Sequence, residues 1–373
     1  MKGFEIISKL CDRKNRIKFV LRDLKEHGKK VVIYGAGYCG HETIALLRAQ
    51  GIPVVAAYDD YAWEGGRIDG IKIDCLSNLC PDKNTVILLT SGFNGKMKKK
   101  LADFGLLQYY VPADFGRYDA EKENYEYFVK NASKLQAAYD LLVDDKSREV
   151  FVRLINYRIS REPDALIDLE ECGQYFPHEN SLNITGFNEC FLDLGAYDGD
   201  SLRGFIDYVD GTYNLIVAVE SSRKNYEDLL LKVRELPHVE CHCVGIWNKK
   251  GELRFSVSDA KNSFATTDGE TVLSVDSVDN IMAGRNVSFI KMDVEGAEYE
   301  AIQGAENTIR QCLPAMAISV YHKVEDLFRL QLLVESIVPG KYKYFLRHYS
   351  PTVIETVLYA VPYDVGGRAH RKG

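Results

Sequence analysis

The chain has 373 residues, of which 46% are hydrophobic and 27% are charged. This globular composition excludes disordered, collagen-like and coiled-coil proteins, and the length favours two domains. Lys and Arg total 47 against 54 for Asp and Glu, which gives a net charge of −7. A protein that binds nucleic acid mainly through its phosphates is usually basic, so we do not expect a nucleic-acid partner.

The cysteines and the apolar segments indicate in which cellular compartment the protein is expected. The 9 cysteines are scattered through the chain and odd in number, which is typical of reduced thiols, and no pairs at zinc-site spacing occur. Charges interrupt the apolar residues near the N-terminus, and no segment approaches the ~20 apolar residues of a membrane span. We therefore expect a cytoplasmic protein without a membrane span.

Within residues 1–116, strand and helix patterns alternate from residue 30 to residue 115. Apolar, β-branched runs predict strands at 29–37, 54–60, 84–92 and 109–114, and helical spacing occurs at 41–50 and 96–106. This alternation is typical of a parallel sheet with covering helices. The pattern predicts a small Rossmann-like α/β domain.

A glycine-rich loop follows the first of these strands. Gly35, Gly37 and Gly40 have the GxGxxG spacing, and Asp59 stands at the end of the next strand. Such a loop lets backbone amides approach a pyrophosphate, while the acid binds ribose hydroxyls. Three interpretations remain open: glycines that serve only the turn, a nucleotide or sugar-nucleotide site, and an NAD site.

Residues 117–185 lack strand signals and predict a helical connector. Apolar residues recur at helical intervals in two runs, Phe128 to Leu142 and Phe151 to Ile159. We expect these helices to pack on one or both of the flanking α/β parts.

From residue 186 the strand–helix alternation returns and continues nearly to the end of the chain. Strand patterns lie at 189–195, 214–220, 239–247, 287–293, 314–321, 342–349 and 356–362, and a local hairpin is expected at 253–258. Strands separated by helices predict a doubly wound parallel sheet. The last two are joined by a short turn, so we expect them to be antiparallel.

A second glycine loop follows the first strand of this part. Its spacing is D-x-G-x-x-x-G, from Asp193 through Gly195 and Ala196 to Gly199, and Glu220 and Ser221 end the next strand. The loop contains no Lys or Arg to hold a pyrophosphate. An acid placed for a ribose, beside a loop open to a zwitterionic amino acid, fits S-adenosylmethionine better than a dinucleotide. The alternative is a simple turn.

Carboxylates crowd around the end of the strand at 287–293. Asp293 stands at the strand tip, where ligands bind in open α/β sheets, and Glu295, Glu298 and Glu300 follow. Glu298 and Glu300 also suit the first turn of the next helix, where carboxylates are favourable.

Together these segments resemble a known family. FLDLGAYDGDS, AVESS, VDSVDNI, FIKMDVEGAE and ISVYHKVEDL, spread over about 186 to 362, resemble the FkbM family of S-adenosylmethionine-dependent methyltransferases. SREVFVRLINYRIS and QYF resemble members that carry an N-terminal Rossmann-like domain, and the first domain is similar in outline to the front domain of some sugar acetyltransferases. The resemblance implies a class I methyltransferase sheet and O-methylation of hydroxyls, often on sugars or polyketide-derived products.

The resulting hypothesis is a methyltransferase domain at 186–373 that methylates a hydroxyl of a carbohydrate or natural-product acceptor. The expected cofactor residues are Asp193, Gly195, Ala196, Gly199, Glu220, Ser221, Asp293 and Glu295. We expect His322, after the fifth strand, to accept the acceptor's proton beside Asp293, because an unperturbed imidazole titrates near ~6.5. Binding of Mg²⁺ by Asp293, His322 and Asp326 stays open, as does the oligomeric state. The alternative function is a non-catalytic regulator that binds S-adenosylmethionine or a sugar nucleotide.

Overall fold

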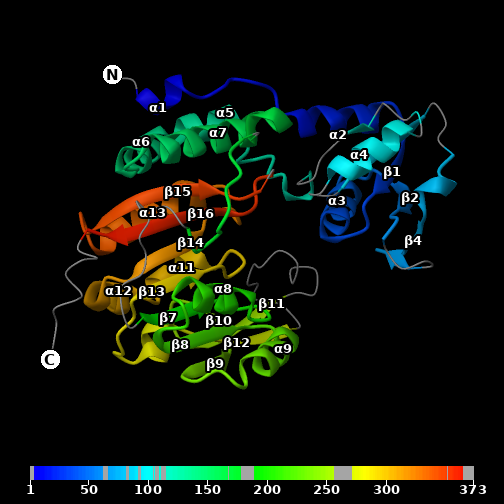
Figure 1. Ribbon diagram of the computed structural model, residues 1–373. Helices are drawn as coiled ribbons and strands as arrows, with labels where there is room; N and C mark the ends of the chain where they lie inside the picture. Colours follow the sequence, from blue (N-terminus) through cyan, green and yellow to red (C-terminus); the bar gives the residue numbers. More distant parts are fainter. Residues whose placement is uncertain are drawn as a thin grey trace.

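The computed structural model contains two α/β parts joined by a helical layer (Figure 1). It describes residues 4–61, 66–80, 84–90, 94–103, 105, 109–110, 115–166, 168–177, 189–255, 271–350 and 352–363.

The first α/β part is built on a sheet with the strand order β3-β4-β2-β1-β5-β6. The strands are β1 (Lys30–Tyr34), β2 (Val54–Tyr58), β3 (Arg67–Ile68), β4 (Ile71–Asp74), β5 (Thr85–Leu89) and β6 (Tyr109–Tyr110). All pairs are parallel except β3 with β4. The four predicted strands are present, although residues 91–92 and 111–114 lie outside the described residues. The short strands β3 and β4 have no counterpart among the predictions.

Helices cover both faces of this sheet. They are α2 (Arg16–Glu26), α3 (Tyr38–Ala49) and α4 (Asn94–Asp103), with short 3-10 turns η1 (Leu76–Asn78) and η2 (Phe115–Arg117). Alternate residues of β1 point to opposite faces, so Val31 and Ile33 pack with α2 and α3 while Val32 packs with Leu101 of α4.

The second α/β part has a seven-stranded sheet with the order β15-β16-β14-β13-β7-β8-β9. Its strands are β7 (Glu189–Leu194), β8 (Tyr213–Glu220), β9 (Val239–Cys243), β13 (Phe289–Met292), β14 (Ala315–Ser319), β15 (Tyr342–His348) and β16 (Thr356–Pro362). The pairs from β9 to β14 are parallel, whereas β16 is antiparallel to both β14 and β15. The predicted doubly wound sheet with an antiparallel end is therefore present.

A separate three-stranded sheet corrects two strand predictions. It has the order β10-β12-β11 and contains β10 (Gly245–Ile246), β11 (Gly251–Phe255) and β12 (Thr271–Asp276). The run 239–247 is not one strand, because β9 ends at Cys243 and β10 pairs with β12 instead. The expected hairpin at 253–258 is an antiparallel pairing of β11 with β12, and residues 256–258 lie outside the described residues.

Two hydrophobic clusters sandwich the seven-stranded sheet. The helices are α8 (Asp200–Tyr208), α9 (Arg223–Val233), α10 (Val278–Met282), α11 (Glu298–Gln303), α12 (Glu306–Cys312) and α13 (Asp326–Ile337). On β7, Phe191 packs with α8 and α9, while its neighbour Leu192 shares a cluster with α11, α12 and α13. All six residues of β7 are buried, as expected for a central strand covered on both faces.

The connector helices belong to the core of the second part. They are α5 (Tyr125–Lys130), α6 (Ala132–Leu141) and α7 (Asp145–Ser160), followed by η3 (Pro163–Leu166), and α6 and α7 lie beside β15 (Figure 1). Phe128, Leu135 and Phe151 are fully buried in the same cluster as the sheet residues. Helix α1 (Glu5–Ser8) also joins this cluster through Ile6, so the first residues described pack away from the first sheet. The connector helices therefore pack on the second part, which is one of the arrangements expected from the sequence.

Among the described residues, no helix combines the length and apolar character that crossing a membrane requires.

Candidate active site

The glycine loop after β7 is held by backbone contacts to neighbouring strands. The amides of Gly195 and Ala196 both donate to the carbonyl of Val219 on β8. Gly195 has a φ of +81°, and a Cβ there would lie 1.8 Å from the carbonyl oxygen of Asp293. Only glycine fits this position, because the backbone after β13 crosses directly against the loop.

Glu220 ends β8 and links this loop to the start of α9. One carboxylate oxygen accepts from the amide of Tyr197 at 2.9 Å, and the other accepts from the amide of Ser222 at 2.6 Å. The residue is only 7% exposed, and burial raises its pKa although both amides oppose the shift. Each carboxylate oxygen has a second lone pair, so Glu220 keeps the capacity to accept hydrogen bonds from a ligand.

Asp293, which follows β13, receives hydroxyl groups from two other segments. Tyr175, from the end of the connector, donates to it at 2.7 Å, and Tyr321, after β14, donates at 3.2 Å. Burial and the charge of Asp293 raise the pKa of both tyrosines well above the ordinary value, which keeps the hydroxyls protonated. Burial opposes ionisation of Asp293 itself, but His322 and Lys291 lower its pKa. The result is an ionised carboxylate with two neutral donors.

A buried ion pair lies beneath the glycine loop. Lys291 on β13 is 3.2 Å from Asp193 on β7, and its Nζ also donates to the carbonyl of Gly195 at 2.5 Å. Asp193 is fully buried and accepts from the Ser201 hydroxyl as well. Asp193 therefore holds Lys291 in position to bind the backbone of the glycine loop.

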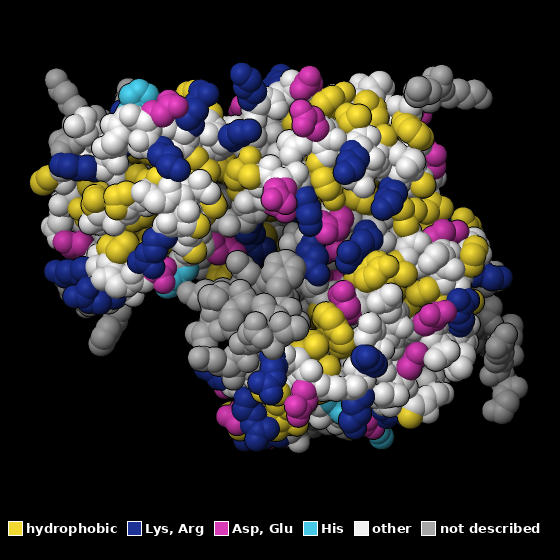
Figure 2. All heavy atoms as spheres, turned by 180° about the vertical axis from the view of Figure 1, so that it is seen from behind, with side chains coloured by type: hydrophobic (Ala, Val, Ile, Leu, Met, Phe, Trp, Pro, Cys, Tyr) yellow, Lys and Arg dark blue, Asp and Glu magenta, His cyan; other side chains and the backbone are white. Residues whose placement is uncertain are grey.

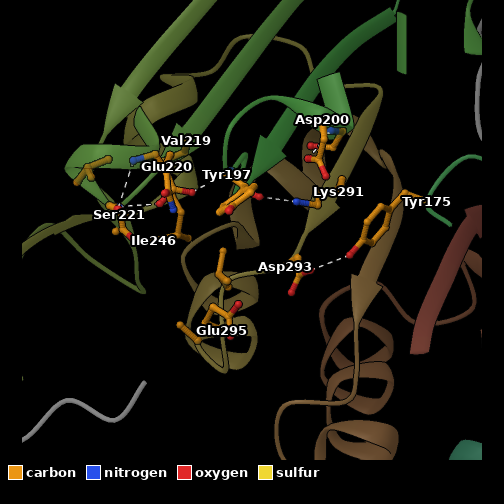
Figure 3. A pocket seen from close by; sticks show the side chains of 18 of the residues that line it. Tyr175, Tyr197, Asp200, Val219, Glu220, Ser221, Ile246, Lys291, Asp293 and Glu295 are labelled. Atoms are coloured by element: carbon orange, nitrogen blue, oxygen red, sulfur yellow. Dashed lines mark hydrogen bonds between the residues drawn. The ribbon is translucent and has the colours of Figure 1, made fainter. Parts of the chain in front are cut away.

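One cleft of about 1020 Å³ joins these groups. Figure 3 shows Glu220 and Ser221 towards one end of the cleft and Asp293 with Tyr175 towards the other. The expected cofactor residues Gly195, Glu220, Ser221, Asp293 and Glu295 line it. The other expected residues, Asp193, Ala196 and Gly199, are not among its lining residues.

Several lining residues were missed by the sequence-based interpretation. They are Tyr175, Tyr197, Lys291, Tyr321 and Glu355. Lys291 carried a detectable signal, because a lysine inside an otherwise apolar strand needs a buried partner. The two tyrosines 175 and 321 carried none, since their contact with Asp293 depends on the tertiary fold.

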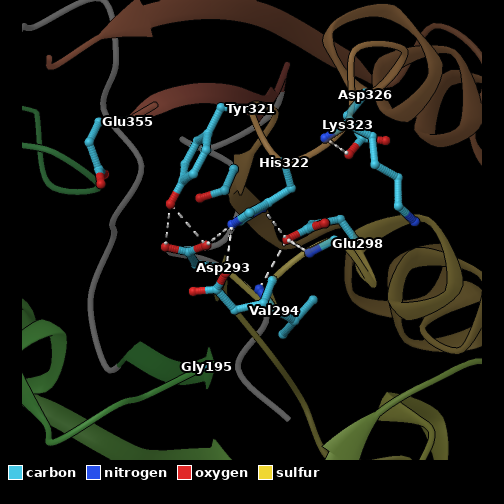
Figure 4. Close-up of polar contacts among 12 residues, drawn as sticks. Gly195, Asp293, Val294, Glu298, Tyr321, His322, Lys323, Asp326 and Glu355 are labelled. Atoms are coloured by element: carbon cyan, nitrogen blue, oxygen red, sulfur yellow. Dashed lines mark hydrogen bonds and ion pairs between the residues drawn. The ribbon is translucent and has the colours of Figure 1, made fainter. Parts of the chain in front are cut away.

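His322 lies next to Asp293, and each of its ring nitrogens has a carboxylate nearby (Figure 4). Its Nδ1 is 2.9 Å from Glu298, and its Nε2 is 3.5 Å from Asp293 and 3.4 Å from Glu295. Burial lowers the pKa of His322, but the three carboxylates outweigh it and raise the pKa well above 6.5. The sequence-based expectation depended on an unperturbed imidazole, whereas His322 is surrounded by three carboxylates that favour its protonated form. As an imidazolium, His322 has no lone pair to accept a proton.

The same cluster of side chains is the candidate site for a metal ion. Ligand atoms of Asp293, Glu298 and His322 lie within 4.8 Å of one another, so Glu298 rather than Asp326 accompanies the other two residues that the sequence offered. Mg²⁺ prefers oxygen ligands and keeps several waters, whereas this set includes a nitrogen. The Glu298 oxygen that faces His322 already accepts from the amides of Val294 and Gly296. The donor set does not fit Mg²⁺, and no step below uses a metal.

The expected ligand loop of the first part has a comparable construction. Gly35 has a φ of +115°, and a Cβ there would lie 2.7 Å from the carbonyl oxygen of Thr90. A Cβ at Gly40 would lie 2.4 Å from the carbonyl oxygen of Gly35, while Gly37 has open space. Asp59 accepts from the amide of Ala36 at 2.7 Å and so braces the loop. The structure thus brings all four expected residues together at one sheet edge.

Comparison with known proteins assigns the second part. Residues 193–337 match the family model described as the methyltransferase FkbM domain. Residues 193–337 form an FkbM methyltransferase domain. The match includes the glycine loop, Glu220, Asp293 and His322. A search of curated proteins gives no match.

One solved structure shares this fold over nearly its whole length. A methyltransferase FkbM from Methylobacillus flagellatus KT is 22% identical, with a TM-score of 0.72 over 95% of this chain and 95% of that chain. Fibrillarin from Aeropyrum pernix, solved with natively bound S-adenosyl-L-methionine, is 15% identical with a TM-score of 0.31, covering 47% of this chain and 67% of that chain. The first likeness extends the shared fold beyond the FkbM domain to nearly the whole chain.

Proposed function

We propose that the FkbM domain transfers a methyl group from S-adenosylmethionine to a hydroxyl group of a carbohydrate or natural-product acceptor. The observation that carries this proposal is the single cleft that joins the glycine loop and Glu220 to Asp293 and its two tyrosines. One end has the groups for an adenosine ribose, and the other has a carboxylate for an acceptor hydroxyl. The FkbM family match and the sequence resemblance support methyl transfer as the activity.

At the cofactor end, the Glu220 carboxylate accepts hydrogen bonds from the ribose hydroxyls. Ser221 and Ile246 lie at the same end of the cleft (Figure 3) and would contact the adenosine. Asp293 follows β13, which lies on the other side of β7 and its glycine loop from β8, so it would face the methyl-bearing end of the bound cofactor.

At the acceptor end, the ionised Asp293 accepts a hydrogen bond from the acceptor hydroxyl and orients its oxygen towards the methyl group. As the new C–O bond forms, the sulfur keeps the electron pair of the old bond and the hydroxyl proton passes to Asp293. His322 balances the charge of Asp293 as an imidazolium and positions it. Alignment of the three reacting atoms supplies most of the rate, an effect of up to ~7–11 kcal/mol.

Product release separates this enzyme from the alternative, a non-catalytic regulator. The purified protein is incubated with S-adenosylmethionine carrying a labelled methyl group and with a panel of glycans and hydroxylated natural products. An enzyme releases S-adenosylhomocysteine and labels one acceptor. Binding of S-adenosylmethionine without release of S-adenosylhomocysteine for any acceptor would favour the regulator. Absence of cofactor binding would contradict both candidate functions.

Glu220 provides the first test of the cofactor end. Glu220→Ala removes the acceptor for ribose and leaves the amides of Tyr197 and Ser222 unpaired, so we expect affinity for S-adenosylhomocysteine to fall about ten- to a hundredfold. Isothermal titration calorimetry measures the change. The matched control is Glu227→Ala on α9, an exposed glutamate whose side chain is 64% accessible. Equal affinity in the two variants would contradict the placement.

A further inference from the structure

A second cavity of about 580 Å³ lies where the two α/β parts meet, and we call it the junction cavity. Tyr38 and Glu42 of α3 and the turn at 116–119 form one wall, and Glu295 and residues 321–325 form the other. Its volume is in the range of ~300–1,000 Å³ that small-molecule sites occupy. No role for it follows from the cofactor and acceptor placements above.

The junction cavity adjoins the catalytic cleft. Glu295 and Tyr321 line both cavities. Tyr321 donates its hydroxyl to Asp293, and its carbonyl accepts from Arg158, which lines the junction cavity. The junction cavity is therefore separated from Asp293 in the cleft only by the wall that Glu295 and Tyr321 form.

Buried polar contacts fix this wall. Arg158 pairs with Glu123 at 3.0 Å, and Arg161 pairs with the same carboxylate. Asn15, which precedes α2 of the first part, donates its side-chain amide to the carbonyl of Arg158 at 3.2 Å. All of these groups are less than 7% exposed, so the two parts are joined by a rigid network beside the cavity.

The other wall is packed equally closely. A Cβ at Gly116 would lie 2.2 Å from the Cβ of Glu42, so the turn at 116–119 sits directly against α3. Arg117 pairs with Glu42 at 3.1 Å, and its guanidinium lies 5.3 Å from the centre of the Tyr38 ring. Tyr38 remains 52% exposed and offers an aromatic surface to the cavity.

Paired charges determine which ligand suits this lining. Figure 2 shows side chains of both charges gathered where the two parts meet. Two cations of the lining have carboxylate partners within it: Arg117 with Glu42, and Lys122 with Glu325 at 2.9 Å. Such a lining offers many hydrogen-bond donors and acceptors with little net charge. Hydroxyl groups both donate and accept, so a polyhydroxylated neutral molecule matches it, whereas a phosphate requires uncompensated cations.

We infer that the junction cavity binds a neutral carbohydrate unit of the acceptor, next to the unit that is methylated in the cleft. This inference rests on the proposed function, because it places the reacting hydroxyl at Asp293. The tyrosine ring of α3 stacks on the sugar, and the paired carboxylates and cations bind its hydroxyls. The first α/β part thereby takes part in acceptor recognition through this cavity.

Direct binding tests the inference without knowledge of the natural acceptor. The probes are the neutral trisaccharides maltotriose, cellotriose, mannotriose and chitotriose, and UDP and inorganic phosphate serve as anionic probes. Calorimetry and saturation-transfer NMR are carried out on full-length protein saturated with S-adenosylhomocysteine. We expect at least one trisaccharide to bind, and the anionic probes not to compete with it.

Variants of the two walls locate the binding. Tyr38→Ala removes the stacking surface and should weaken trisaccharide binding about tenfold or more, while Tyr38→Phe keeps the ring and should stay within about threefold. Lys122→Met, which removes the partner of Glu325 on the opposite wall, should also weaken binding. Tyr61→Ala is the matched control, because Tyr61 is 88% exposed on the same part and lines neither cavity. Circular dichroism melting verifies that each variant is folded.

The inference is overturned if no trisaccharide binds, if only UDP or phosphate binds, or if Tyr38→Ala and Lys122→Met both bind like the parent. Failure of the proposed function is seen separately, as absent S-adenosylhomocysteine binding or absent methyl transfer in the same preparations.

Discussion

Asp293→Asn is expected to lower the turnover of methyl transfer by about 10²–10⁴-fold, the range typical for loss of a group that accepts the proton. Asparagine has nearly the same shape and keeps one oxygen, so the contacts from Tyr175 and Tyr321 can largely persist. The substitution removes the negative charge that accepts the proton and that pairs with His322. Turnover is measured as release of S-adenosylhomocysteine with an acceptor identified in the panel.

Two comparisons separate a catalytic role of Asp293 from a structural one. Affinity for S-adenosylhomocysteine, measured by calorimetry, should stay within a few-fold of the parent, because Glu220 and the glycine loop are unchanged. Tyr175→Phe removes one donor to the same carboxylate and should cost no more than about tenfold. Turnover of Asp293→Asn within tenfold of the parent, in a protein that binds the cofactor, would contradict the assignment.

The sequence could predict the sheets because their signals are local. Runs such as 189–195 and 287–293 are mainly apolar over the length of a buried strand, and Asp193 and Asp293 stand near their carboxyl ends. The sequence also predicts that position 195 requires glycine, but the structure gives a different reason for this requirement. The loop spacing predicts room for the cofactor, whereas the close approach observed is that of the Asp293 carbonyl oxygen, which would lie 1.8 Å from a Cβ at this position.

The sequence could not predict the surroundings of Asp293 because they come from distant segments. Tyr175 reaches it from the connector, and Phe176 beside it packs 6.1 Å from the ring of Phe191 on β7. A boundary placed after this segment separates the tyrosine from the site it completes. The same applies to His322, whose pKa is set by Glu298 and Glu295 at contact distances that no spacing rule gives.

The largest expected effect on stability comes from Lys291→Met. The lysine and Asp193 have side chains that are 5% and 0% exposed, so the substitution leaves a buried carboxylate without its cation. Removing one partner of a buried ion pair costs roughly 3–5 kcal/mol of unfolding free energy. The carbonyl of Gly195 also loses its donor, so binding of S-adenosylhomocysteine should weaken in the same variant. Urea denaturation followed by circular dichroism measures the stability change.

The pH dependence and a double variant test whether the unpaired charge is the cause. Burial already raises the pKa of Asp193 in the parent, and loss of Lys291 removes the main opposing interaction. The folded variant then binds a proton more readily than the unfolded chain does, so its stability must fall as pH rises. The deficit against the parent should therefore be smaller at pH 5 than at pH 8, and Asp193→Asn combined with Lys291→Met should recover part of it.

An exposed pair on the same part of the chain is the matched control. Lys232 on α9 pairs with Asp198, but its side chain is 50% accessible. Lys232→Met should cost less than about 1 kcal/mol, because water solvates the remaining carboxylate. If Lys291→Met costs as little as this control, the ion pair does not support the glycine loop. A large cost that is independent of pH and is not reduced by Asp193→Asn would instead assign the effect to side-chain packing.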